Sequence, residues 1–165
     1  MIRRRTTPLE EQIMDWFVKY FIKSSLVWFS AAVVLALAMA LLPALAVYRT
    51  AHLHMALLGF VTQMIYGVAL HVIPRFFGQP LVYRRAAEVQ FWAAQSGLLL
   101  LVSGFAARVH ALPFAATALV VGGSLSAVGA GCFVVNLWRT IDASPMHRIN
   151  ATGRPVPLMP QADAH

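Results

Sequence analysis

The chain has 165 residues, of which 59% are hydrophobic and 12% are charged, and its mean hydropathy is +0.69. Soluble domains carry about 25% charged and about 45–50% apolar residues, so this composition argues against a soluble globular protein and indicates an integral membrane protein. The net charge of +7 does not indicate nucleic acid as a partner, because the basic residues stand between apolar segments, where they set orientation in a membrane. The single cysteine, Cys132, excludes an intrachain disulfide and a cysteine-based metal site.

Residues 1–24 are predicted to form a cytoplasmic or interfacial segment. Between Pro8 and Ser24 the acidic residues come early, the basic residues come late, and apolar residues alternate with them. This pattern is typical of an amphipathic helix that lies at the inner headgroups. The alternative is a cytoplasmic extension of the first membrane-spanning helix, and the sequence favours neither.

Four apolar segments are long enough to cross a bilayer, which needs about 20 residues. They lie within a transmembrane domain over residues 25–139, and they cover residues 26–47, 53–73, 89–107 and 114–137. The connections between them are short, so neighbouring helices are expected to pack antiparallel. The predicted fold class is therefore all-α, a four-helix transmembrane bundle.

Two features at the end of the first span affect how the chain continues. Pro43 lies inside this span and is expected to kink it near its outer end. Ala44-Leu45-Ala46 has the form of a signal-peptide cleavage site, but the apolar run is longer than a usual signal peptide, so we expect it to be retained. At the other end of the chain, residues 140–165 form a polar, proline-rich tail that is expected to be disordered or docked on a partner.

The distribution of lysine and arginine predicts the orientation. With the N-terminus inside, eleven of the 13 basic residues fall on inner segments, and only Arg49 and Arg108 fall outside. The positive-inside rule therefore favours an N-in, C-in protein of the cell inner (cytoplasmic) membrane, with both termini cytoplasmic.

Ionisable side chains inside a membrane are costly and indicate function by default, which draws attention to His52 and His54 at the start of the second span. Two positions along a helix correspond to about 200° around its axis, so the two imidazoles face opposite sides and cannot easily chelate one metal ion. Each could ligate a flat cofactor or contact a neighbouring helix. Gly59 lies at helical spacing below His52, among small residues that leave a slot for a porphyrin or, equally, let another helix approach.

Three further residues lie near the level of this pair. Arg49 and Arg108 could pair with heme propionates, or they could be interfacial anchors. His110, in the short outer loop, is a candidate for a second axial ligand, although a surface position is favoured.

The run from Ala51 to Leu81, AHLHMALLGFVTQMIYGVALHVIPRFFGQPL, resembles the tenth helix of heme-copper oxidase subunit I and the loop that follows it. The matching residues are His52, His54, Gly59, Gly67, His71 and Pro74, and Phe91-Trp92 with residues 97–110 is similar to the next span. The similarity covers a little over a third of the chain. It implies that His52 is the proximal ligand of a high-spin heme and His54 a ligand of a low-spin heme on the opposite face.

The chain also departs from that family. The three further histidines of the oxygen-reducing binuclear centre have no counterpart, and the first span has no histidine to serve as second ligand of a low-spin heme. We therefore do not expect this chain alone to be an oxygen or nitric oxide reductase.

The favoured function is a heme-b-binding integral membrane subunit, with one or two hemes, that transfers electrons in a respiratory assembly. Its electron partners would be quinone or an outer-side redox protein, and an open coordination site would instead make it a sensor of diatomic gases. The alternative is a non-catalytic accessory or assembly subunit of a membrane oxidoreductase complex. All of these predict contact with the lipid bilayer and a homo-oligomer or larger membrane complex, without nucleic acid. A transporter or channel is less favoured, because the spans have few polar residues at mid-depth.

Overall fold

The structure is a computed structural model that describes residues 14–143. All regular structure in this range is helical, and four helical segments are long and apolar enough to cross a membrane. The expected class, an all-α multi-pass membrane protein, is therefore confirmed. The predicted amphipathic segment before residue 14 and the predicted tail after residue 143 lie outside the described range.

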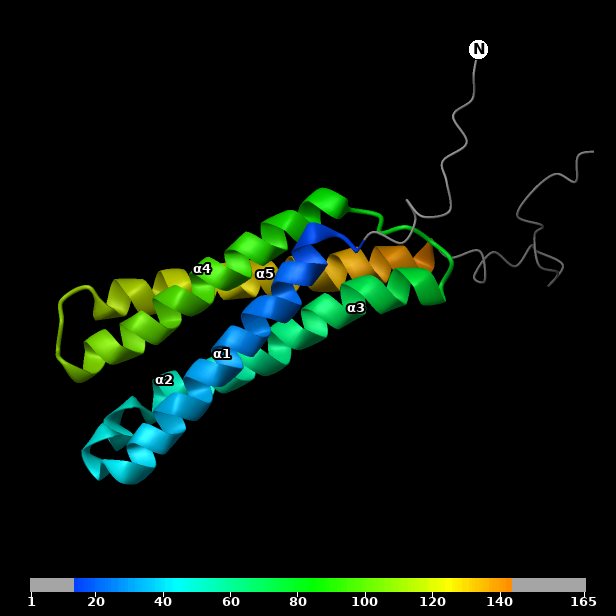
Figure 1. Ribbon diagram of the computed structural model, residues 1–165. Helices are drawn as coiled ribbons and strands as arrows, with labels where there is room; N and C mark the ends of the chain where they lie inside the picture. Colours follow the sequence, from blue (N-terminus) through cyan, green and yellow to red (C-terminus); the bar gives the residue numbers. More distant parts are fainter. Residues whose placement is uncertain (1–13, 144–165) are drawn as a thin grey trace, which may run out of the picture.

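The elements follow one another in a simple order (Figure 1). They are α1 (Trp16–Leu41), the 3-10 helix η2 (Pro43–Tyr48), α2 (Arg49–His54), the π-helix η3 (Met55–Thr62), α3 (Gln63–Phe76), α4 (Arg84–Val109) and α5 (Ala115–Asp142). The elements from η2 to α3 follow one another directly and together make the second candidate span, Pro43–Phe76. Each of the four predicted spans overlaps one of these four segments.

The first span ends earlier than predicted, because α1 stops at Leu41. The N–H of Leu42 still bonds the carbonyl of Ala38 at 2.8 Å, but Pro43 has no N–H to continue the helix and its ring would clash with the preceding turn. Pro43 therefore begins the 3-10 helix η2 instead of kinking a continuous helix.

At its other end α1 begins at Trp16 and runs without a break through Ser24. Within the described residues, the predicted N-terminal segment is thus an extension of the first span and not a separate helix. The Asp15 carboxylate, just before α1, pairs with Arg84 of α4 at 2.7 Å. The placement of the N-terminal segment at the membrane interface stays a prediction.

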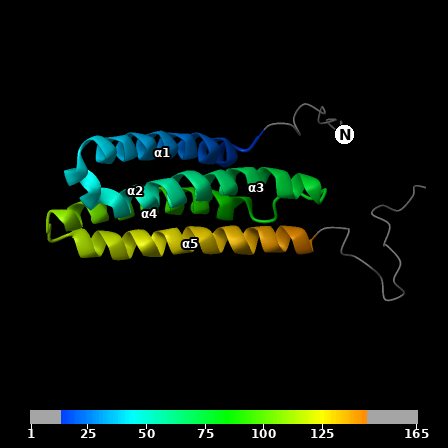
Figure 2. The same cartoon turned by 90° about the horizontal axis from the view of Figure 1, so that it is seen from below.

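The bundle consists of two antiparallel hairpins. In one, α1 packs along η3 and α3; in the other, α4 packs along α5, and the two hairpins cross at an angle (Figure 1). The start of α1 and the end of α5 lie at the same end of the bundle (Figure 2). This end also carries most of the charge and is called the basic end here, for Lys19, Lys23, Arg75, Arg84, Arg85 and Arg139.

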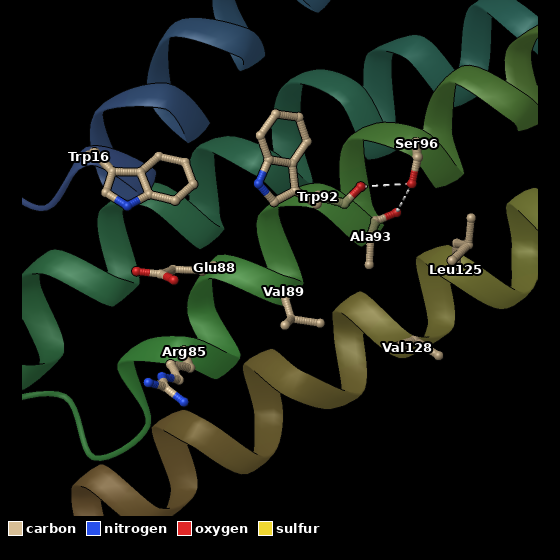
Figure 3. A pocket seen from close by; sticks show the side chains of 9 residues that line it. All are labelled: Trp16, Arg85, Glu88, Val89, Trp92, Ala93, Ser96, Leu125 and Val128. Carbon is tan, nitrogen blue, oxygen red and sulfur yellow. Dashed lines mark hydrogen bonds between the residues drawn. The ribbon is translucent and has the colours of Figure 1, made fainter.

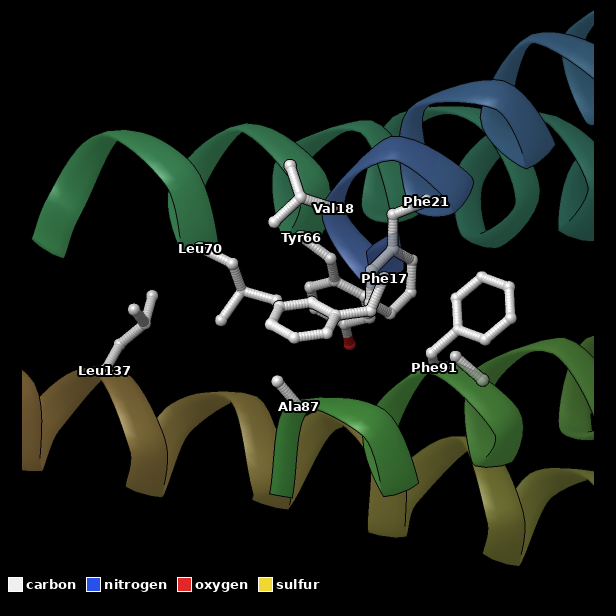
Figure 4. Close-up of a cluster of buried hydrophobic side chains, with 9 residues drawn as sticks. Phe17, Val18, Phe21, Tyr66, Leu70, Ala87, Phe91 and Leu137 are labelled. Atoms are coloured by element: carbon white, nitrogen blue, oxygen red, sulfur yellow. The ribbon is translucent and has the colours of Figure 1, made fainter. Parts of the chain in front are cut away.

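A cluster of buried hydrophobic side chains lies close to the basic end, where the two hairpins meet (Figure 4). Phe21 of α1 is central, since its ring packs edge-to-face on Phe91 of α4 at 5.0 Å and on Tyr66 of α3 at 5.6 Å. Edge-to-face pairs contribute about 0.5–1.5 kcal/mol beyond their buried area. The aromatic cluster therefore joins α1, α3 and α4 at one level.

Helices α4 and α5 approach so closely that glycine is required at their contact. A Cβ atom on Gly122 would lie 2.8 Å from both the carbonyl oxygen of Gly97 and the backbone nitrogen of Leu101. Small residues allow this backbone approach, which drives helix association in membranes. Gly123, one position later, has nothing within 4 Å of its own Cβ position.

Replacing Gly122 with alanine is expected to destabilise the bundle by about 1–3 kcal/mol, because backbone atoms of α4 must move away. The measurement is unfolding by sodium dodecyl sulfate in mixed micelles, followed by circular dichroism. Gly123→Ala is the matched control and is expected to be neutral or stabilising by up to about 1 kcal/mol, through helix propensity. Equal losses in both variants would contradict the close packing of α4 on α5.

Candidate functional site

His52 and His54 belong to α2, which lies at the opposite end of the bundle from the start of α1 and the end of α5 (Figure 2). This end is formed by η2, α2 and the turn between α4 and α5, and it is called the histidine end here (Figure 1). It brings together Tyr48, His52, His54 and His110.

His52 is half-buried and turned toward α1. Its Nδ1 lies 3.1 Å from the carbonyl oxygen of Ala32. A carbonyl can only accept, so Nδ1 must donate its N–H in this hydrogen bond. The neutral imidazole then carries its free lone pair on Nε2, which is the state that a metal ligand requires.

His54 is oriented in the same way but toward the other hairpin. Its Nδ1 donates to the carbonyl oxygen of Thr50, one turn earlier, at 2.9 Å. Its ring packs on Phe105 of α4, with 4.5 Å between the centroids. The two imidazoles thus contact different helices, in agreement with the 200° separation expected from their spacing.

The π-helix η3 begins directly after His54 and changes the register of the span. Its buried residues, Met55 and Gly59, continue a series from Ala51 to Gln63 in steps of four. A regular α-helix would rotate the last of these by about 120° from the first, whereas the wider π turn keeps all four on the side facing the bundle. π-Helical segments are rare and frequently occur at functional sites.

The slot predicted beside Gly59 is filled in the structure. A Cβ on Gly59 would lie 2.7 Å from both Cβ and Cγ of Trp28, and 3.1 Å from Leu98. At Gly59 the structure shows the alternative that the sequence left open, the close approach of another helix, which is α1 with Trp28. The donor atoms of His52 and His54 fit a heme iron, but the Gly59 face does not offer a place for the macrocycle beside Trp28.

His110 ends α4 and is exposed, as the sequence favours. Its Nε2 lies 2.7 Å from the hydroxyl of Tyr48, a contact that holds η2 against the α4–α5 turn. Because Nε2 is engaged with Tyr48, only Nδ1 of His110 remains as a donor toward a metal.

Arg49 and Arg108 are both exposed and belong to this end, at the start of α2 and near the end of α4. Neither takes part in an ion pair with another of the described residues. Their guanidinium groups therefore stay available to anionic groups of a cofactor or of lipid headgroups.

No three His, Cys, Asp or Glu side chains between residues 14 and 143 come together in a way that could hold a metal ion. A heme places a smaller demand on the protein, because the porphyrin supplies four nitrogen donors and the chain needs to supply one or two. His52 and His54, which are oriented separately, could each supply one such donor atom.

Tyr48, Phe105 and Trp28 complete the histidine end, and the sequence did not point to them. Each contacts a residue at least 31 positions away in the chain, so no local spacing relates the partners. The only hint was that the first span contains a tryptophan, a side chain large enough to fill the space that Gly59 leaves.

No protein-family model matches the chain, and no curated protein matches it. The structure defines the class, a helical membrane protein with four candidate spans. The resemblance to heme-copper oxidase subunit I stays a prediction from the sequence.

A cluster of polar side chains lies at mid-depth, directly after the π-helix. Gln63 is 1% exposed, and its Oε1 accepts from Ser24 of α1 at 2.6 Å and from Gln95 of α4 at 2.7 Å. Gln95 also donates to Ser24 at 2.6 Å, and Trp28 approaches Gln95 at 3.4 Å. The cluster therefore ties both hairpins together below the histidines.

We expect Gln63→Leu and Gln95→Leu to show a coupling energy of about 0.6–1.7 kcal/mol in a double-mutant cycle, because each removes hydrogen bonds shared with the other. Stability in mixed micelles is measured for the single and double variants. Thr62→Val is the control, since Thr62 bonds only the Leu57 carbonyl of its own helix among the described contacts. Strictly additive losses would show that the amide pair does not join the hairpins.

Proposed function

We propose that the chain is a heme-b-binding membrane subunit that transfers electrons in a respiratory assembly. One observation carries the proposal. His52 and His54 each donate Nδ1–H to a backbone carbonyl, which leaves an Nε2 lone pair on two different sides of one helix. Ligating histidines characteristically donate their other ring nitrogen in this way, because the bond sets the tautomer and the ring orientation.

His52 or His54 is the axial ligand in this proposal, and Arg49 and Arg108 are the partners of the propionates. Heme b supplies reversible one-electron chemistry when it is bound. The Nε2 of His110 is engaged with Tyr48, so we assign the second axial position to a second protomer of a homo-oligomer or leave it open. An open position would give the gas-binding variant of the same function.

Electron transfer is preferred over oxygen or nitric oxide reduction on sequence grounds. Apart from the pair, the chain has four histidines, and these are His71, His110, His147 and His165. Within residues 14–143, His110 contacts Tyr48 at the histidine end and His71 contacts Arg75 near the basic end, and no three His, Cys, Asp or Glu side chains come together. Quinone and an outer-side redox protein remain the electron partners that suit a single-electron membrane carrier.

The charges of the two ends support a location in the cell inner membrane with both termini cytoplasmic. The basic end carries six lysine and arginine residues within the described range, whereas the histidine end carries Arg49 and Arg108. The positive-inside rule places the basic end in the cytoplasm and the histidines near the outer face.

An absorption spectrum of the purified protein, oxidised and dithionite-reduced, tests the heme. We expect a Soret band and a sharp reduced α-band. A band unmoved by carbon monoxide means two axial ligands, and a band shifted by carbon monoxide means an open site. A protein without a Soret band, after expression with ample heme, would overturn the proposal and favour an accessory subunit.

The ligand is identified by His52→Ala and His54→Ala in the same measurement. We expect one of them to abolish the Soret band or to convert the heme to a form that binds carbon monoxide. His71→Ala is the matched control because His71 lies near the other end of the same span, where it pairs with Arg75. Loss of heme in the control alone would move the site to the basic end.

The orientation is tested with two reporters fused to the C-terminus. With a cytoplasmic C-terminus we expect green fluorescent protein to fluoresce and alkaline phosphatase to be inactive, since each folds on only one side of the inner membrane. The opposite pattern would place the histidine end in the cytoplasm.

A further inference from the structure

A groove of about 590 Å³ lies on the lipid-facing side of α4 and α5, toward the basic end of the bundle (Figure 3). It lies away from the histidine end, and the proposed function does not use it. Its lining changes in character along its length, from charged at the basic end to apolar toward the middle of the bundle.

The mouth of the groove carries Arg85, Glu88 and the indole of Trp16 (Figure 3). The neighbouring Arg84 is engaged with Asp15 at 2.7 Å and approaches Glu88 at 3.9 Å. Arg85 forms no ion pair with the other described residues. The mouth therefore presents one guanidinium group without an ion-pair partner among the described residues, beside an aromatic ring, which is a typical arrangement at the level of lipid headgroups.

The wall of the groove is apolar and faces the bilayer. Trp92 is 65% exposed, Val89 54% and Val128 52%, so more than half of the surface of each residue is free of contact with the protein. Ser96 lies at the deep end, but its hydroxyl donates to the carbonyl of Trp92 at 2.7 Å. The deep end therefore suits a hydrocarbon chain better than a polar group.

The length of the groove agrees with one lipid leaflet. From Arg85 to Ser96 the helix advances eleven residues, which corresponds to about 16 Å at about 1.5 Å per residue. One half of the hydrocarbon core of a bilayer measures about 15 Å. A molecule that pairs with Arg85 could thus extend its chain along the whole wall without leaving its leaflet.

We propose that this groove binds an anionic phospholipid, with its phosphate at Arg85 and one acyl chain against Val89, Trp92 and Val128. The unpaired guanidinium group of Arg85 pairs with the phosphate, and the apolar wall holds the chain. Glu88 opposes the anion, and its approach to Arg84 reduces this repulsion. The cytoplasmic leaflet, where the orientation proposed above puts the basic end, is the leaflet that carries an excess of anionic lipid.

The test is native mass spectrometry of the protein released from micelles that contain equal amounts of phosphatidylglycerol and phosphatidylcholine. We expect one phosphatidylglycerol to be retained per chain. Arg85→Gln is expected to reduce the preference for phosphatidylglycerol about fivefold, since one basic residue near a membrane surface contributes about 1 kcal/mol. Arg75→Gln makes the same charge change at the same end, outside the groove, and is expected to leave the preference unchanged.

A second pair of variants tests the wall. Val128→Trp fills the groove and is expected to abolish retention, while Val120→Trp adds the same side chain at an exposed position of α5 outside the groove. Equal retention of both lipids, retention that survives Val128→Trp, or a quinone in place of the phospholipid would each overturn the proposal. The readout is lipid mass, so its outcome is independent of whether the chain binds heme.

Discussion

Inside a bilayer no water is available to the backbone, so every spanning segment must satisfy its own N–H and C=O groups as a helix. Under this constraint the spans can be joined only through side chains and close backbone contacts, because lipid tails are as apolar as the helix surfaces. The two hairpins of this chain meet at three levels. These are the aromatic cluster around Phe21 and Phe91, the amide and hydroxyl groups around Gln63, and the histidine end, where His54 packs on Phe105.

The π-helix η3 connects the middle level with the histidines. Its wide turns keep Gln63 on the same side as Ala51, which allows the amide to reach Gln95 on the other hairpin. The segment begins directly after His54, so one irregular stretch separates the two oriented imidazoles from the polar cluster. Both Nδ1 atoms have backbone carbonyl partners, so the two imidazole rings are oriented without a cofactor.

The two ends of the bundle differ in chemistry, and each suits a different task. The histidine end holds two oriented imidazoles and two arginines without ion pairs among the described residues, and the heme proposal rests on these groups. The basic end holds Arg85, which has no ion pair among the described residues, above an apolar wall, and the phospholipid proposal rests on these groups. Exposed apolar surface on every span is compatible with contact to the lipid bilayer. The same surface leaves room for further copies or other subunits beside the lipid.

The sequence by itself determined the class of protein, the number of spans and the opposed directions of His52 and His54, because hydrophobic length and helical period are properties of a linear string. It also located Pro43 as a disturbance, although a helix end and a kink look alike in sequence. Only the tertiary structure decided that Trp28 fills the space at Gly59, that Tyr48 engages His110, and that η3 changes the register of its span. The contacts of Trp28 and Tyr48 join residues far apart in the chain, and no local pattern encodes their distances. The π-helix is local, but the side chains that it brings to one side have their partners on other helices.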